Sequence, residues 1–149
     1  MLDWTPDLTV NNPELDRQHV ELFRRLHQAS DALDGGAPLA VDLAIAEFAD
    51  TFVEHVAAEE TAMDEALYPD RIRHKAAHEL FMADFLRFRE ELRTHGPTEE
   101  AAEWIRTRIP EWLSFHIRVN DAPLAAYLAR RTPNPTEVRR PGGETKRFS

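Results

Sequence analysis

Apolar residues recur at intervals of three and four positions along most of the chain, a spacing typical of amphipathic helices that face a shared core. Four stretches carry this pattern, spanning residues 13–35, about 39 to 63 or 67, 71–95 and 99 to about 120. No stretch alternates apolar and polar residues for long enough to predict a strand. The pattern predicts an all-α fold, an up-down-up-down antiparallel four-helix bundle with an N-terminal extended arm and a short C-terminal helix.

Residues suited to helix ends support these boundaries. Asn12, Asp70 and Thr98 are good N-caps for the first, third and fourth helices. Pro110 falls inside the fourth helix, where a proline forfeits one backbone hydrogen bond and crowds the carbonyl of Arg106. We therefore expect a kink at this point.

The inward stripe of each helix follows from the periodicity, and the arm has apolar residues that can lie on the core. These positions are Trp4, Leu8 and Val10 in the arm; Leu15, His19, Leu22, Phe23, Leu26, Ser30 and Leu33; Leu43, Phe48, Phe52, His55, Glu59 and Met63; Ile72, His74, His78, Phe81, Phe85, Phe88 and Leu92; and Ile105, Ile109, Trp112 and His116. Each helix thus has at least one histidine in its inward stripe.

Two pairs of these polar residues have the spacing of metal ligands. His55 and Glu59 lie four residues apart, as do His74 and His78, so each pair occupies one face of its helix, one turn apart. Burying such groups without partners costs roughly several kcal/mol. A metal ion coordinated by all of them removes this cost. Of the seven histidines, His27 and His95 fall off the stripes, and we interpret them as ordinary surface residues.

Composition narrows the function. The chain has 149 residues, the length of one domain, and no cysteine, so any metal must be held by imidazole and carboxylate groups. A formal net charge of −9 argues against nucleic acid as a partner. The chain has no apolar run as long as a membrane span, and its beginning resembles no signal segment, so we expect a cytoplasmic protein.

The last residues differ from the rest. Residues 1–131 are predicted to form the bundle, whereas residues 132–149 are rich in proline, glycine and charge and poor in apolar residues. Such a segment cannot build a core, so we expect a disordered tail, with docking of a protein partner as the alternative.

Asp121 follows His116 by five residues, which is about 140° round a regular helix. It shares the inward face only if the helix ends between them, and Asn120 together with Pro123 makes such an ending plausible. The alternative is that Asp121 caps a short helix running from Pro123 to about Arg131. The spacing alone leaves both interpretations open.

The complete pattern resembles the hemerythrin family, in particular its single-domain bacterial members. The family motif has one histidine on the first helix, H-x-x-x-E on the second, H-x-x-x-H on the third and H-x-x-x-x-D at the end of the fourth. Its counterparts here are His19, His55, Glu59, His74, His78, His116 and Asp121. The similarity covers residues 4 to about 128 and includes the surrounding segments Leu15-Asp16-Arg17-Gln18 and Glu59-Glu60.

The resemblance implies two iron ions with a bridging oxo or hydroxo group and dioxygen as the ligand. By resemblance, one iron takes the imidazoles of His74, His78 and His116, the other takes those of His19 and His55 and keeps an open position, and Glu59 and Asp121 bridge. It also implies an apolar wall around the open position, formed by Leu22, Val56, Trp112, Leu113 and Ile117. Val56 stands where the family usually has phenylalanine, which predicts a roomier pocket.

The implied function is reversible dioxygen binding by a monomeric carrier rather than an enzyme. Two alternatives use the same site: a sensor of oxygen, nitric oxide or iron, and an enzyme that scavenges nitric oxide or peroxide. A ferritin-like oxidase is disfavoured because the chain has no E-x-x-H pair. A zinc hydrolase is disfavoured because H-E-x-x-H is absent and seven ligands exceed a tetrahedral site.

Overall fold

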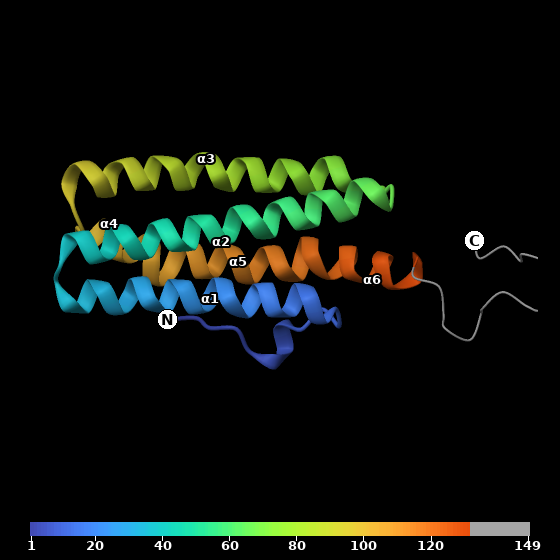
Figure 1. The fold of residues 1–149 in the computed structure, drawn as a ribbon, viewed down its shortest axis with the longest axis horizontal. Helices are drawn as coiled ribbons and strands as arrows, with labels where there is room; N and C mark the ends of the chain where they lie inside the picture. Colours follow the sequence, from blue (N-terminus) through green and yellow to red (C-terminus); the bar gives the residue numbers. More distant parts are fainter. Residues whose placement is uncertain (132–149) are drawn as a thin grey trace, which may run out of the picture.

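The computed structural model describes residues 1–131, and the predicted tail, 132–149, lies outside the described residues. Three long helices, α1 (Pro13–Gly35), α2 (Pro38–Glu65) and α3 (Arg71–His95), run antiparallel to their neighbours (Figure 1). The fourth helix consists of consecutive segments: α4 (Glu99–Glu103), η2 (Trp104–Arg108), α5 (Ile109–His116), η3 (Ile117–Asp121) and α6 (Ala122–Arg131). The all-α four-helix bundle predicted from the periodicity is confirmed.

The arm covers the start of α1. It contains one 3₁₀ turn, η1 (Pro6–Leu8), and buries Leu8 and Val10 against the core. Both oxygens of the Asp16 carboxylate hold it in place, one accepting from the Thr9 hydroxyl at 2.7 Å and the other from the Val10 amide at 2.8 Å.

Two of the three predicted caps form. The Asn12 side chain accepts a hydrogen bond from the Leu15 amide at 3.1 Å, and Thr98 accepts one from Ala101 at 3.1 Å. Asp70 makes no side-chain cap, so that prediction was wrong. Its carbonyl instead accepts the His74 amide, which begins the α3 ladder. Gly36 ends α1 with a φ of 73°, a left-handed conformation that glycine adopts without strain.

The fourth helix departs from our expectation at two places. Before Pro110 the chain forms a π turn, η2, in which the Ile109 amide donates to the Trp104 carbonyl five residues back. This wider turn is the local response to the proline, whose ring would otherwise meet the Arg106 carbonyl. The helix also does not end between His116 and Asp121: it continues through a second π turn, η3, in which the Ala122 amide donates to the Ile117 carbonyl.

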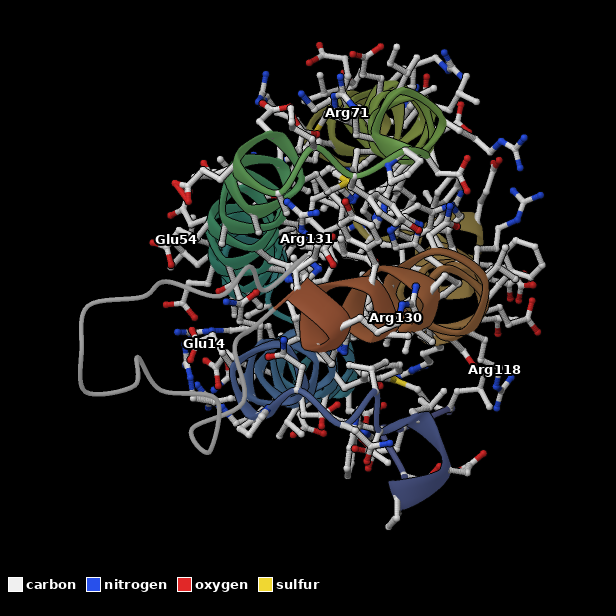
Figure 2. The ribbon with its side chains drawn as sticks, turned by 90° about the vertical axis from the view of Figure 1, so that its right-hand side faces the viewer. Glu14, Glu54, Arg71, Arg118, Arg130 and Arg131 are labelled. Carbon is white, nitrogen blue, oxygen red and sulfur yellow. The ribbon has the colours of Figure 1, made fainter. Side chains whose placement is uncertain are left out.

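The core lies between the four helices, and charged side chains such as Glu54, Arg71 and Arg118 lie at the periphery when the bundle is viewed along its axis (Figure 2). The largest side chains that are almost fully buried include Phe23, Phe48, Phe52 and Phe85. Leu43 and Ile72, which the periodicity placed inward, are 58% and 79% exposed. On a regular helix Leu43 lies about 180° from Phe52 and Ile72 about 180° from Phe81, so both face away from the buried stripe and the inward prediction for them was wrong.

Candidate metal centre

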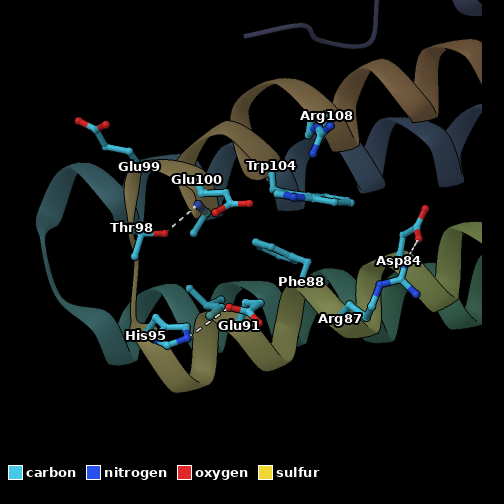
Figure 3. A pocket seen from close by; sticks show the side chains of 12 residues that line it. Asp84, Arg87, Phe88, Glu91, His95, Thr98, Glu99, Glu100, Trp104 and Arg108 are labelled. Atoms are coloured by element: carbon cyan, nitrogen blue, oxygen red, sulfur yellow. Dashed lines mark hydrogen bonds and ion pairs between the residues drawn. The ribbon is translucent and has the colours of Figure 1, made fainter.

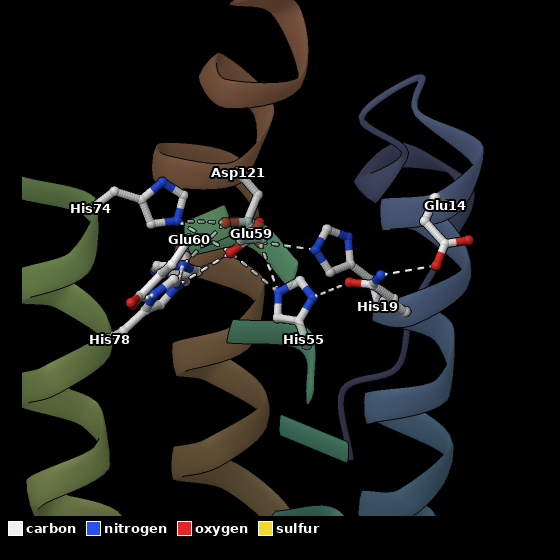
Figure 4. Close-up of polar contacts among 10 residues, drawn as sticks. Glu14, His19, His55, Glu59, Glu60, His74, His78 and Asp121 are labelled. Carbon is white, nitrogen blue, oxygen red and sulfur yellow. Dashed lines mark hydrogen bonds and ion pairs between the residues drawn. The ribbon is translucent and has the colours of Figure 1, made fainter. Parts of the chain in front are cut away.

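Seven polar side chains from all four helices meet inside the bundle, and none is more than 3% exposed. They come from α1 (His19), α2 (His55 and Glu59), α3 (His74 and His78), α5 (His116) and η3 (Asp121). Figure 4 shows the imidazoles arranged around the two carboxylates. The structure therefore brings together every residue of the predicted ligand set.

Local helix geometry explains how each element presents its groups. The four-residue spacings on α2 and α3 stack each pair one turn apart, as expected. For Asp121 the π turn supplies what a regular helix cannot, because it places residues about five apart on one face. Asp121 is consequently 0% exposed, and its Oδ1 lies 3.1 Å from Nε2 of His116.

The carboxylates lie between the imidazole rings. Asp121 Oδ2 is 2.9 Å from His19 Nε2, and Oδ1 is 3.0 Å from His74 Nε2. Glu59 Oε1 is 3.4 Å from His55 Nε2, 3.3 Å from His74 Nε2 and 3.2 Å from His78 Nε2. The Nε2 atoms thus point inward, as ligand atoms do.

The seven residues divide into two overlapping groups whose ligand atoms lie within 4.8 Å of one another. We call Glu59, His74, His78, His116 and Asp121 the three-histidine group, and His19, His55, Glu59 and Asp121 the two-histidine group. Both carboxylates belong to both groups, which is the arrangement required of groups that bridge two adjacent ions.

Several of these buried atoms lack hydrogen-bond partners among the described residues. They are both carboxylate oxygens of Glu59, Asp121 Oδ1, both ring nitrogens of His74 and His19 Nδ1. A buried polar atom left in this state costs about 1–3 kcal/mol. A bound cation would satisfy the inward-facing atoms at once, and imidazole with carboxylate suits iron, manganese, copper or zinc. The residues present therefore fit a metal centre.

The electrostatics reflect close packing of opposite charges. Burial opposes ionisation of Asp121, but the imidazoles of His116 and His19 that lie against its oxygens hold its pKa well below the usual range. Burial opposes protonation of His74, but the adjacent carboxylates of Asp121 and Glu59 outweigh it and raise its pKa to about 9. Without metal, the centre thus keeps positive charge on imidazole beside its carboxylates.

Two further residues contact the centre from outside, and the sequence-based prediction included them only within segments that resemble the hemerythrin family. Gln18 accepts a hydrogen bond from His55 Nδ1 at 2.6 Å, and Glu60 accepts one from His78 Nδ1 at 2.9 Å. Each directly adjoins a ligand residue in the sequence, His19 or Glu59. Apart from the family resemblance of these segments, that adjacency was the only available signal, because contact with a ring on another helix depends on how the helices pack.

The predicted apolar wall is partly visible. Leu22, Leu113 and Ile117 are buried in the core, whereas Val56 and Trp112 are half-buried and pack against it. The indole of Trp112 stacks on the His116 ring with centroids 4.5 Å apart. Trp112 therefore contacts the three-histidine group, although the family resemblance had placed it beside the open position of the other ion.

The remaining histidines lie away from the centre. His27 is near Asp3, at 3.3 Å, and its side chain is 41% exposed; His95 is near Glu91, at 3.4 Å, and its side chain is 62% exposed. His95 also lines a groove of about 1080 Å³ at the opposite end of the bundle, between α3 and α4 (Figure 3). None of the seven clustered residues lines this groove, whose floor includes the stacked rings of Phe88 and Trp104.

Within residues 1–131, no helix combines the length and apolar character required to cross a membrane. The fold and the site together define a four-helix-bundle protein with an interior cluster of histidine and carboxylate side chains that is able to hold metal. Residues 11–128 match the model of the hemerythrin HHE cation binding domain, and the chain belongs to the hemerythrin family.

Individual relatives agree with this assignment. The bacteriohemerythrin of Stenotrophomonas maltophilia is 34% identical over 128 residues, covering 84% of this chain and 80% of that protein. The bacteriohemerythrin of Pseudomonas aeruginosa is 31% identical over 121 residues, covering 81% and 77%. A solved structure of a leucine-to-phenylalanine mutant aligns with a TM-score of 0.75 at 21% identity, covering 87% of this chain and 98% of that one, which shows the shared fold.

Proposed function

We propose that the protein binds dioxygen reversibly at a non-haem di-iron centre and acts in its storage or delivery. The observation that carries this proposal is the division of seven buried ligands into two overlapping groups with unequal histidine numbers. Equal groups would favour two equivalent ions. Unequal groups favour one ion saturated by protein and one with a position free for a small ligand.

Each group has a defined part in the proposal. The three-histidine group would hold the saturated iron, the two-histidine group would hold the iron with the open position, and Glu59 and Asp121 would bridge them. The iron pair would supply the electrons that make dioxygen binding reversible. The protein holds the ligands in place on four helices and keeps bulk water away.

Water exclusion is what distinguishes a carrier from an oxidase at such a site. Leu22, Leu113 and Ile117 are at most 2% exposed and offer no proton donor or acceptor. Water or a proton that reached the bound dioxygen would promote release of the dioxygen as a reduced species. A dry wall therefore favours release of dioxygen unchanged. The burial of these residues supports a carrier over a scavenging enzyme.

The test is the optical spectrum of the iron-loaded, reduced protein before and after exposure to air. We expect a visible band that appears with oxygen and disappears when oxygen is removed. His27→Ala is a matched control, because it deletes a histidine outside the centre and should leave the band intact. A protein that holds two irons and shows no reversible band, or that consumes nitric oxide or peroxide at steady state, would overturn the carrier function.

A further inference from the structure

One imidazole in each ligand group is hydrogen-bonded to a side chain outside the group, and the two partners differ in charge. In the two-histidine group the partner of His55 is the neutral amide of Gln18, at 2.6 Å. In the three-histidine group the partner of His78 is the carboxylate of Glu60, at 2.9 Å. Both rings are only 3% exposed.

These contacts fix the tautomer of each ring. An amide oxygen and a carboxylate can only accept, so Nδ1 of His55 and of His78 must carry the hydrogen. The lone pair is then on Nε2, which faces the centre. By contrast, the Nδ1 atoms of His19 and His74 have no hydrogen-bond partner among the described residues.

The orientation of the Gln18 amide is set independently. Its nitrogen donates to Glu14 at 3.0 Å, which turns the oxygen toward His55. Glu14 itself is held by Arg17, whose hydrogen bonds lower the pKa of Glu14 to about 2. A neutral amide therefore separates His55 from the nearest carboxylate on this side, whereas Glu60 touches His78 directly.

A charged acceptor forms a stronger hydrogen bond than a neutral one and draws the ring hydrogen toward itself. The opposite nitrogen then becomes a better electron donor to a metal, and such partners typically change metal affinity about 10- to 100-fold. The charged acceptor, and with it the stronger electron donation, is thus found in the three-histidine group, which already has more histidines.

We propose that Glu60 and Gln18 are positioning residues that make the two metal positions unequal. Glu60 strengthens the three-histidine position and favours a higher metal charge there, while Gln18 leaves the two-histidine position weaker and more easily emptied. The inference rests on the metal-binding part of the proposed function and is independent of dioxygen.

The experiment titrates the metal-free full-length protein with Co²⁺, following the visible spectrum in the presence of a competing chelator. Wild type should bind two ions in two separated steps. Glu60→Gln preserves the acceptor and removes its charge, so the tighter step should weaken about 10- to 100-fold. Glu65→Gln removes the same charge from an exposed position on α2 and should change neither step. Gln18→Glu should tighten the weaker step and bring the two steps together.

The melting temperature of each metal-free variant separates this role from a structural one. We expect Glu60→Gln to melt like wild type, since the hydrogen bond remains. Unchanged affinities in Glu60→Gln, or weakening accompanied by a lower melting temperature without metal, would overturn the inference. Wild type that binds no Co²⁺ would instead overturn the proposed metal centre.

Discussion

The two halves of the bundle are built on opposite principles. The half that contains the α1–α2 connection is closed by apolar side chains, among them Ile45, Phe48, Phe85, Ile105 and Ile109. The half that contains the α2–α3 connection holds all eight buried polar or charged residues of the described chain, seven of which form the candidate metal centre. The same four helices thus carry an apolar core at one end and a polar cluster at the other, where a smaller apolar cluster of Met63, Tyr68 and Leu124 is also buried.

This difference separates folding from function along the helix axis. The apolar half gains stability by removing surface from water and needs no ligand. The polar half contains buried atoms without partners and is completed only when something occupies it. We therefore expect substitutions in the apolar half to change the free energy of unfolding directly, and substitutions in the polar half to act mainly through metal.

The largest effect on stability should come from Phe48→Ala. Phe48 is 0% exposed and contacts the rings of Phe52 and Phe85, so the substitution should lower the free energy of unfolding by about 3–5 kcal/mol. Urea denaturation of the metal-free protein measures it. Leu43→Ala, at a 58% exposed position of the same helix, should change it by less than about 0.5 kcal/mol. A variant that keeps its stability and loses metal would contradict the division between the halves.

The next effect concerns His78→Ala, which removes a ligand from the three-histidine group. The variant should lose most of its iron, whereas we expect wild type to hold two ions per chain. It should also lose the stabilisation that metal confers, about 2.7 kcal/mol when free metal is at 100 times its Kd. Elemental analysis and melting with and without metal measure both quantities. His95→Ala is the control, and full iron occupancy in His78→Ala would refute the assignment.

A smaller effect concerns pH, which should change the apparent metal affinity and the stability of the metal-free protein in opposite directions. Because the pKa of His74 is raised to about 9, this ring is protonated in the metal-free protein at neutral pH and must release its proton to bind metal. Apparent metal affinity should therefore rise between pH 6.5 and 9, by up to roughly tenfold per unit for one released proton.

The stability of the metal-free protein should move the other way. A raised pKa means that the folded state holds the proton more tightly, so this contribution is complete below pH 6.5 and is lost as the pH rises through about 9. Proton release on metal addition, measured in buffers of different ionisation enthalpy, tests the first trend, and melting across this range tests the second. Release of no proton at pH 7.5 would show that His74 is neutral.

The smallest effect is expected from Val56→Phe in the polar half. Val56 is half-buried, so a larger ring has room to extend and should avoid much of the 1–3 kcal/mol or so that overpacking costs. By restricting water it should slow autoxidation, measured as the decay of the oxygen-bound spectrum at fixed pH. Val53→Phe, at a 54% exposed position on α2, is the control. Equal decay rates in a folded, fully loaded variant would show that this position does not control access.

The apolar half was the easier half to predict from the sequence. Phe48, Phe85 and Ile105 recur at helical spacing, and burial of such residues follows from periodicity alone. Two pairs of the ligand set were also predictable, because His55 with Glu59 and His74 with His78 depend only on regular helix geometry, whereas the complete set came from the family resemblance. These predictions required no knowledge of how the helices pack.

The parts that failed depend on backbone detail or on contacts between helices. Asp121 does lie inward, but through the π turn η3 and not through the helix ending that Asn120 and Pro123 suggested. Asp70 had the composition of a cap and lacks the geometry. The contacts of Gln18 and Glu60 join different helices, so no pattern within one helix reveals them.

The two π turns have a further consequence for the angular phase of the fourth helix. Each turn uses about one residue more than a regular turn does, so every residue after it is set back by about 100° relative to a continuous α-helix. Two such shifts between Trp104 and Asp121 rotate the side chains of α6 about the helix axis by more than half a revolution, relative to a continuous α-helix. In this orientation the Tyr127 hydroxyl donates to the Ala66 carbonyl at 2.8 Å and fastens α6 to the end of α2. A single-residue deletion within η3 would therefore misdirect every contact beyond it, including those of residues that never approach the metal centre.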